Sequence, residues 1–125
     1  MTPDFHDGFL DGFLLFPNEV VHLYLRTAAG QAYSLVCIGV QRLKLSNVRE
    51  GNIILDVEVR TTEELEAADI DELYEISTAD MIDRRANLLE AAKREALQEV
   101  IVSPSYGAEF MVLLKRWEIQ PGVIK

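Results

Sequence analysis

The run Phe110-Met111-Val112-Leu113-Leu114 is apolar at five consecutive positions. Because neighbouring side chains of a strand point to opposite faces, a strand formed by this run would be apolar on both sides. Both faces must then be covered, so we interpret the run as a central strand on which earlier strands and at least one helix pack. A chain of 125 residues is long enough to bury such a core within one domain.

Five segments before residue 61 read as strands. They cover residues 8–16, 20–26, 32–38, 40–45 and 53–60, and the last has the cleanest alternation, with Ile53, Leu55, Val57 and Val59 on one face. The links between them are short. Short links between successive strands predict an antiparallel meander.

The pattern changes to a helical period at Thr61, where a threonine precedes Glu64 by three positions and predicts a capping box. A second cap is predicted at Ser77, followed by a helix that extends to about Leu97. Strands are predicted again over residues 99–103 and 109–119, with a bend at residues 104–107. We therefore predict one α+β domain over residues 1–125. It is a bent antiparallel sheet or partly open barrel of about seven strands, with two helices inserted between strands five and six.

Negative charge is concentrated in one segment of the chain. The sequence has 21 acidic and 12 basic residues, and nine of the acids lie between Thr62 and Asp83, a segment without Lys or Arg. The remaining 12 acids match the 12 bases, so the rest of the chain is neutral overall. An acidic protein repels phosphate backbones and anionic headgroups, which argues against nucleic acid and membrane surfaces as partners.

A concentrated acidic helical surface favours encounter with a basic protein partner, although a merely solvated helical face gives the same pattern. Our leading hypothesis is a non-enzymatic interaction module, of immunity or regulatory type. Its predicted partner-binding residues are acids of the helical segment and two aromatic anchors nearer the C-terminus: Glu63, Glu64, Asp69, Asp71, Glu72, Tyr106 and Trp117. Edge strands of the sheet could also pair across a two-fold axis, so a homodimer is a second expectation.

The alternative hypothesis is a barrel-like protein that binds a small molecule at its mouth. The residues predicted for that site are Tyr24 and Trp117 together with the polar residues of one loop: Asn47, Arg49, Glu50 and Asn52. Loops held by a rigid sheet often carry binding residues. The same loop is also explained by an Asx-type turn with a solvated Arg–Glu pair.

An enzyme that uses His6 and Asp7 is the third hypothesis, since an imidazole beside a carboxylate can act as a base or begin a metal site. Adjacent residues of an extended segment point apart, which argues against the pair. Two histidines and one cysteine cannot complete a structural zinc site, and no serine motif or glycine-rich phosphate loop is present. We therefore expect no catalytic residues, no metal and no cofactor, and we interpret Cys37 as a small buried hydrophobe.

The sequence contains no apolar run of the roughly 20 residues that a membrane-spanning helix needs. The first residues also lack the basic region of a secretion signal. From these two observations we expect a cytoplasmic protein.

Three short motifs of the chain are similar to those of a group of small bacterial proteins, mostly of unknown function. These motifs are His6-Asp7-Gly8 before the first strand, the strands that end at Val59, and Ser105-Tyr106-Gly107-Ala108-Glu109 before the last strand. Some members of the group resemble immunity proteins of bacterial polymorphic toxin systems, which neutralise a toxin by binding it. The resemblance implies a binding protein and transfers no catalytic residue.

Overall fold

The computed structural model describes residues 3–76 and 82–125, which form an α+β fold. Its strands and helices, in chain order, are β1 (Phe9–Phe16), β2 (Val20–Arg26), β3 (Ala32–Ile38), β4 (Arg42–Ser46), β5 (Asn52–Arg60), a 3₁₀ turn η1 (Thr62–Glu64), α1 (Ala67–Tyr74), α2 (Ile82–Arg94), β6 (Gln98–Tyr106), β7 (Glu109–Leu114) and β8 (Arg116–Pro121). The predicted class and the antiparallel sheet are confirmed. The sheet has eight strands rather than seven.

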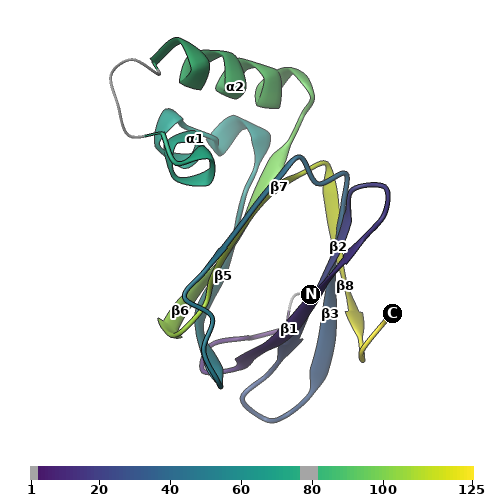
Figure 1. The fold of residues 1–125 in the computed structure, drawn as a ribbon. Helices are drawn as coiled ribbons and strands as arrows, with labels where there is room; N and C mark the ends of the chain where they lie inside the picture. The colour runs from purple at the N-terminus through teal and green to yellow at the C-terminus, as the bar shows by residue number, and fades with distance from the viewer. Residues whose placement is uncertain (1–2, 77–81) are drawn as a thin grey trace.

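All eight strands belong to one antiparallel sheet in the order β4-β7-β6-β5-β1-β2-β3-β8. The sheet folds over so that β5, β6 and β7 form one wall and β1, β2, β3 and β8 form the other (Figure 1). The two walls are joined where β1 pairs with β5, and this pairing involves only Phe9 and Leu10 of β1. The sheet is not closed into a barrel, because β4 and β8 remain its two ends.

Strand β7 is buried on both faces, as its sequence predicts. Phe110, Val112 and Leu114 point into the core between the two walls and are fully buried. Met111 and Leu113 point the other way, into a second apolar cluster made with residues of the helical segment and its flanks: Leu65, Leu73, Ala92 and Leu97. A run of five apolar residues is therefore stable here because each face has its own cover.

The predicted five-strand meander is wrong. Of those five strands, only β1, β2 and β3 are neighbours in chain order, whereas β4 pairs with β7 on the other wall. The chain leaves β3 at Gly39, whose φ of +69° favours glycine. The amide of Gln41 then donates to the carbonyl of Leu113 at 2.8 Å, so β4 begins against β7.

The predicted final strand over residues 109–119 is two strands, which accounts for the extra strand. The chain crosses between the walls at Lys115, whose amide donates to the carbonyl of Ile38 at 3.1 Å. Strand β8 then pairs with β3, while β7 stays with β6 and β4. The bend predicted at residues 104–107 also lies later, because β6 continues through an irregular pairing of Pro104 with Ile54 and turns at Gly107, where φ is +88°.

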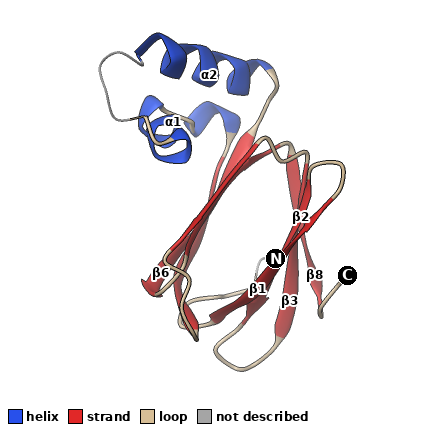
Figure 2. Ribbon diagram, viewed as in Figure 1, coloured by secondary structure: helices blue, strands red, loops and turns tan. Residues whose placement is uncertain are grey.

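The helical segment begins with the predicted capping contact, since Glu64 accepts a hydrogen bond from the Thr61 amide at 3.0 Å. This contact starts only the 3₁₀ turn η1. The helix α1 begins after Glu66, whose amide donates to Asp69 at 2.8 Å. Both helices lie at one end of the wall formed by β5, β6 and β7 (Figure 2), and we call η1, α1 and α2 together the helical cap. The cap predicted at Ser77 falls outside the described residues.

Candidate functional site

Three of the nine acids in the helical segment are bound by basic side chains of the fold. The ion pairs are Asp69 with Arg60 at 3.3 Å, Asp71 with Arg85 at 2.9 Å and Glu75 with Lys44 at 3.9 Å. These pairs tie α1 to β5, to α2 and to β4. The predicted partner-binding residues Asp69 and Asp71 therefore hold the cap in place rather than facing outward freely.

Glu64 has a local role at the start of the cap. Its carboxylate accepts hydrogen bonds from the amide and the hydroxyl of Thr61 at 3.0 and 2.9 Å. These bonds favour the charged form and lower the pKa of Glu64 below its ordinary value. Among the predicted partner-binding acids, Glu64 therefore completes the capping box of η1, in which Thr61 is the N-cap.

Apart from Glu64, four acids of the segment from Thr62 to Asp83 are exposed and form no ion pair within residues 3–76 and 82–125. They are Glu63, Glu66, Glu72 and Asp83, and we call them the exposed cap acids. Glu63 and Glu72 are among the residues predicted to meet a partner. Asp80 lies outside the described residues.

The two predicted aromatic anchors do not join the cap in one surface. Tyr106 is 53% exposed but lies at the far end of β6 from the cap. Eight residues of extended strand, about 25 Å, separate it from Gln98 beside α2. Trp117 is half-buried on β8 of the other wall, opposite Cys37, where it packs against the core.

Two of the residues predicted for a small-molecule site, Tyr24 and Asn52, form side-chain hydrogen bonds with the backbone of other segments. The Tyr24 hydroxyl donates to the carbonyl of Ile124 at 2.7 Å. Asn52 is buried, and its side-chain oxygen accepts hydrogen bonds from the amides of Arg49 and Ala108. The remaining side chains of that loop, those of Asn47, Arg49 and Glu50, are exposed.

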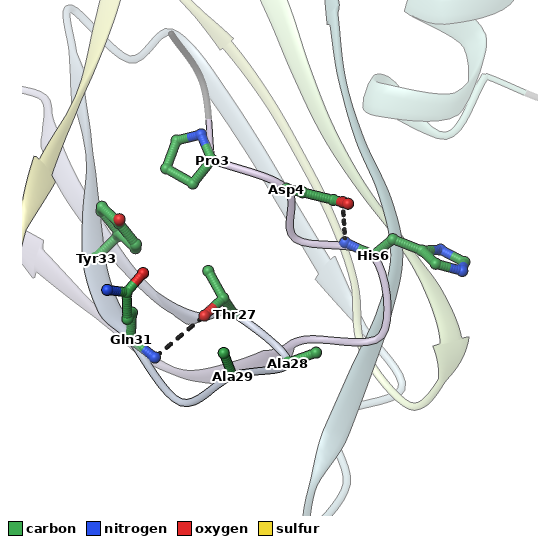
Figure 3. Close-up of a pocket in the computed structure, with 8 residues that line it drawn as sticks. All are labelled: Pro3, Asp4, His6, Thr27, Ala28, Ala29, Gln31 and Tyr33. Carbon is green, nitrogen blue, oxygen red and sulfur yellow. Dashed lines mark hydrogen bonds between the residues drawn. The ribbon is translucent and has the colours of Figure 1, made fainter.

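A hollow of about 490 Å³ lies elsewhere, beside the N-terminal segment and the turn between β2 and β3 (Figure 3). Its lining residues are Pro3, Asp4, His6, Thr27, Ala28, Ala29, Gln31 and Tyr33. None of the residues predicted for the small-molecule site is among them. Its volume is in the range of ligand pockets, but its polar groups do not converge on one point (Figure 3).

His6 and Asp7 do approach each other, contrary to the expectation from an extended segment. Asp7 has a φ of +60°, which turns the chain and brings its carboxylate to 3.6 Å from Nε2 of His6. The other ring nitrogen of His6 lies 2.8 Å from the carbonyl oxygen of Leu55. This hydrogen bond, followed by the charge of Asp7, raises the pKa of His6.

The His6–Asp7 pair lacks the surroundings of a catalytic or metal site. Both side chains are exposed, and the imidazole points away from the hollow beside Pro3 and Tyr33 (Figure 3). Within the described residues, no three His, Cys, Asp or Glu side chains are placed to hold a metal ion. The visible effect of the pair is to fasten the N-terminal segment to β5.

Cys37 is fully buried, and burial raises the pKa of its thiol to about 12. We expect the folded protein to react with a thiol reagent such as dithionitrobenzoate at pH 8 at least about 100-fold more slowly than the same chain in urea, because both access and thiolate are suppressed. Release of the coloured thiolate measures both rates. Fast reaction of the folded chain would contradict a core position.

The carboxyl group that sequence reasoning missed is Glu99 on β6, which is only 1% exposed. Neither of its oxygens has a hydrogen-bond partner within the described structure. Burial is the main cause that raises its pKa, to about 8, and the charge of Asp69 adds to it. A glutamate at the start of a predicted strand gives no signal of burial, because the α1 residues that lie near it, Asp69 and Glu72, come much earlier in the sequence.

No helix within the described residues is both long and apolar enough to cross a membrane. No protein-family model, no curated protein and no solved structure matches this chain.

Proposed function

We propose that the protein is a non-enzymatic interaction module whose helical cap docks a basic protein partner. The observation that carries this proposal is the set of exposed cap acids, Glu63, Glu66, Glu72 and Asp83, which have no internal basic partner in the described structure. Negative charge is concentrated on η1 and α1, which contain no Lys or Arg, whereas the exposed bases of the cap, Arg84, Lys93 and Arg94, lie on α2. Concentrated charge of one sign speeds encounter with an oppositely charged surface and selects against like-charged competitors.

The attachment of the cap to the sheet also supports a docking role. Besides its ion pairs, the cap is held by Arg42, whose Nε donates to the carbonyl of Leu73 at 3.0 Å, and by Lys44, whose Nζ donates to the carbonyl of Glu72 at 3.2 Å. Arg42 also lies over the ring of Tyr74 at 4.9 Å. A surface that is already ordered loses little conformational entropy when it binds.

The partner expected on this basis presents a cluster of Lys and Arg side chains. The resemblance to immunity proteins adds one class of candidate, a toxin whose basic surface the cap would cover. The small-molecule alternative has less support, because the hollow beside Tyr33 offers no convergent set of charged groups.

The test combines affinity capture from a lysate of the source cells with binding measurements on each captured protein after purification. The cap variant carries Glu63→Gln, Glu66→Gln and Glu72→Gln. A matched body variant carries Glu50→Gln, Asp56→Asn and Glu118→Gln, which remove the same charge from exposed positions outside the cap. We expect the cap variant to raise Kd about tenfold or more, and the body variant to change it less than about twofold.

Salt dependence is the second readout of the same experiment. Binding through exposed charges should weaken steadily between about 50 and 300 mM salt, since the screening length falls over that range. Docking through the cap would be contradicted if the cap and body variants lost affinity equally. It would also be contradicted if salt left the affinity unchanged.

A further inference from the structure

Strand β1 has one edge that is largely unpaired. It pairs with β2 from Phe9 to Phe16, except at the bulged residue Asp11, but with β5 only at Phe9 and Leu10. A bulge between Leu10 and Gly12 turns the strand away from β5. From Asp11 to Phe16, no strand of the described residues covers this edge. A free edge presents backbone N–H and C=O groups that can pair with another strand.

The free part of β1 is apolar on both faces. Phe13 and Leu15 lie opposite the core residues Leu23 and Val21, so they share the core side of the wall, yet they are 39% and 63% exposed. Their exposure follows from the divergence of β5. Leu14 lies on the other face and is 43% exposed. Three consecutive exposed apolar residues on a strand edge are typical of an interaction site.

The other open edges of the sheet carry residues that normally prevent pairing. Strand β4 is short and contains Arg42 and Lys44. Strand β8 contains Arg116, Glu118 and Pro121. The edge of β5 that diverges from β1 contains Asp56, Glu58 and Arg60. Charged side chains, proline and short length all protect an edge from a second strand.

Strand β1 has no such protection over Gly12 to Phe16, a stretch without a charged residue. The nearest acid, Asp11, is already paired with Arg26 at 2.9 Å. The contrast among these edges therefore singles out β1 as the edge that lacks protection against pairing.

We propose that β1 pairs with β1 of a second copy of this chain, antiparallel and about a two-fold axis near Leu14. This arrangement places Phe13 of one copy opposite Leu15 of the other, and Asp11 opposite Pro17 rather than opposite another acid. Each copy carries a net charge of −9, so two copies repel each other over most of their surface. The neutral β1 edge is a place where they can meet without bringing like charges together.

The expected dimer is weak, because six residues of one strand from each copy bury much less than the roughly 1,200–2,000 Å² of a standard interface. Two copies should associate at tens to hundreds of micromolar and separate on dilution. The pairing uses the wall that does not carry the helical cap, so both caps stay accessible and the inference does not depend on the proposed function.

The first test is sedimentation velocity over about 1 to 500 μM protein, a range that brackets weak association. For the wild type we expect the mass to rise from the 14.1 kDa of one chain toward twice that value. Leu15→Lys should shift the transition to at least about tenfold higher concentration, since it places a charge on the paired edge. Val123→Lys is the matched control at a position that is 58% exposed, and it should leave the transition unchanged.

A cysteine placed near the axis tests the geometry. Because Cys37 is buried, Leu14→Cys gives one accessible thiol per chain. Facing residues of an antiparallel pair have Cα atoms about 4.5–5.5 Å apart, within reach of a disulfide. Under mild oxidation, Leu14→Cys should form covalent dimers at least about tenfold faster than Val123→Cys.

Three results would overturn the inference. They are a wild type that is monomeric at 500 μM, a Leu15→Lys variant that dimerises like the wild type, and equal cross-linking rates of the two cysteine variants. Circular dichroism melting shows whether each variant is folded, and Leu15 is exposed enough that its substitution leaves the core intact.

Discussion

Glu99→Gln is expected to raise the free energy of unfolding at pH 7 by about 3 kcal/mol relative to the wild type. The glutamate is buried beneath the helical cap with no hydrogen-bond partner for either oxygen in the described structure. An amide of the same size fills the same space without a proton to bind. The substitution should therefore remove an unfavourable titration and leave the packing unchanged.

The groups that face Glu99 explain why its neutral form is favoured. Arg60 lies opposite on β5 and is the basic group that acts on Glu99 within the described residues, but it is already paired with Asp69 and Glu58. Asp69 and Glu72 from α1 and Glu58 from β5 add negative charge around the carboxyl, and the neighbour on β7 is the apolar Leu113. Burial raises the pKa of Glu99 most, and the nearby acids raise it further. The charge of Arg60 lowers it and offsets part of this effect.

The raised pKa fixes the sign of the pH dependence. The pKa of Glu99 is about 8 in the folded chain and about 4.5 as an ordinary glutamate. Between these values the folded state holds a proton that the unfolded state has released, so stability falls as pH rises. The contribution of protonated Glu99 to the free energy of unfolding is complete below about pH 4.5 and is lost by about pH 8.

Urea unfolding at half-unit steps from pH 4.5 to 9 measures this dependence in the wild type, in Glu99→Gln and in the exposed control Glu118→Gln. The difference between wild type and Glu99→Gln should grow with pH and level off above about pH 8. Since one pKa unit corresponds to about 1.4 kcal/mol, the 2.5 units between pH 4.5 and pH 7 give the expected 3 kcal/mol. Parallel curves for the wild type and Glu99→Gln would show that the carboxyl is solvated.

The elements of this fold follow from local patterns, whereas their pairing does not. The two-sided apolar run 110–114, the alternation in β5 and the change of period at Thr61 are all visible in the sequence. The crossings at Gly39 and Lys115 are not, because an alternating strand such as β4 can pair equally well with β3 or with β7. The error in strand order and strand count comes from these two crossings.

At the candidate site, counting charges in the sequence likewise does not show which acids form ion pairs in the fold. The sequence locates the acidic segment but does not show that Asp69, Asp71 and Glu75 meet Arg60, Arg85 and Lys44. The pairs of Asp69 and Glu75 depend on where β5 and β4 lie beneath the cap, and the pair of Asp71 depends on how α1 packs against α2. The burial of Glu99 and the open edge of β1 likewise depend on tertiary structure. Glu99 is buried because the helical cap covers β6, and the edge of β1 is open because β5 diverges from it.

The role inferred for Asn52 changes most between sequence and structure. Its position in a loop suggests contact with a ligand, whereas its hydrogen bonds in the fold give it a structural role. Its side-chain oxygen accepts hydrogen bonds from the amide of Arg49 at 2.7 Å and from the amide of Ala108 at 3.0 Å. A Cβ on Gly107 would overlap this same oxygen, so the turn after β6 is built closely around it. Asn52 thus joins the start of β5 to the turn between β6 and β7.

Asn52→Ala should lower the free energy of unfolding by about 2–3 kcal/mol, since it leaves two backbone amides without an acceptor and one of them is buried. The melting temperature should fall by roughly 10 °C. Asn52→Asp keeps an acceptor at the same place and should lose less than half as much, while the exposed neighbour substitution Glu50→Ala should leave stability nearly unchanged. Thermal and urea unfolding of the three variants measure how much stability each one loses. If Asn52→Asp destabilised the chain as much as Asn52→Ala, the shared acceptor would not be what fastens the loop, and the side chain would again be free to serve a ligand.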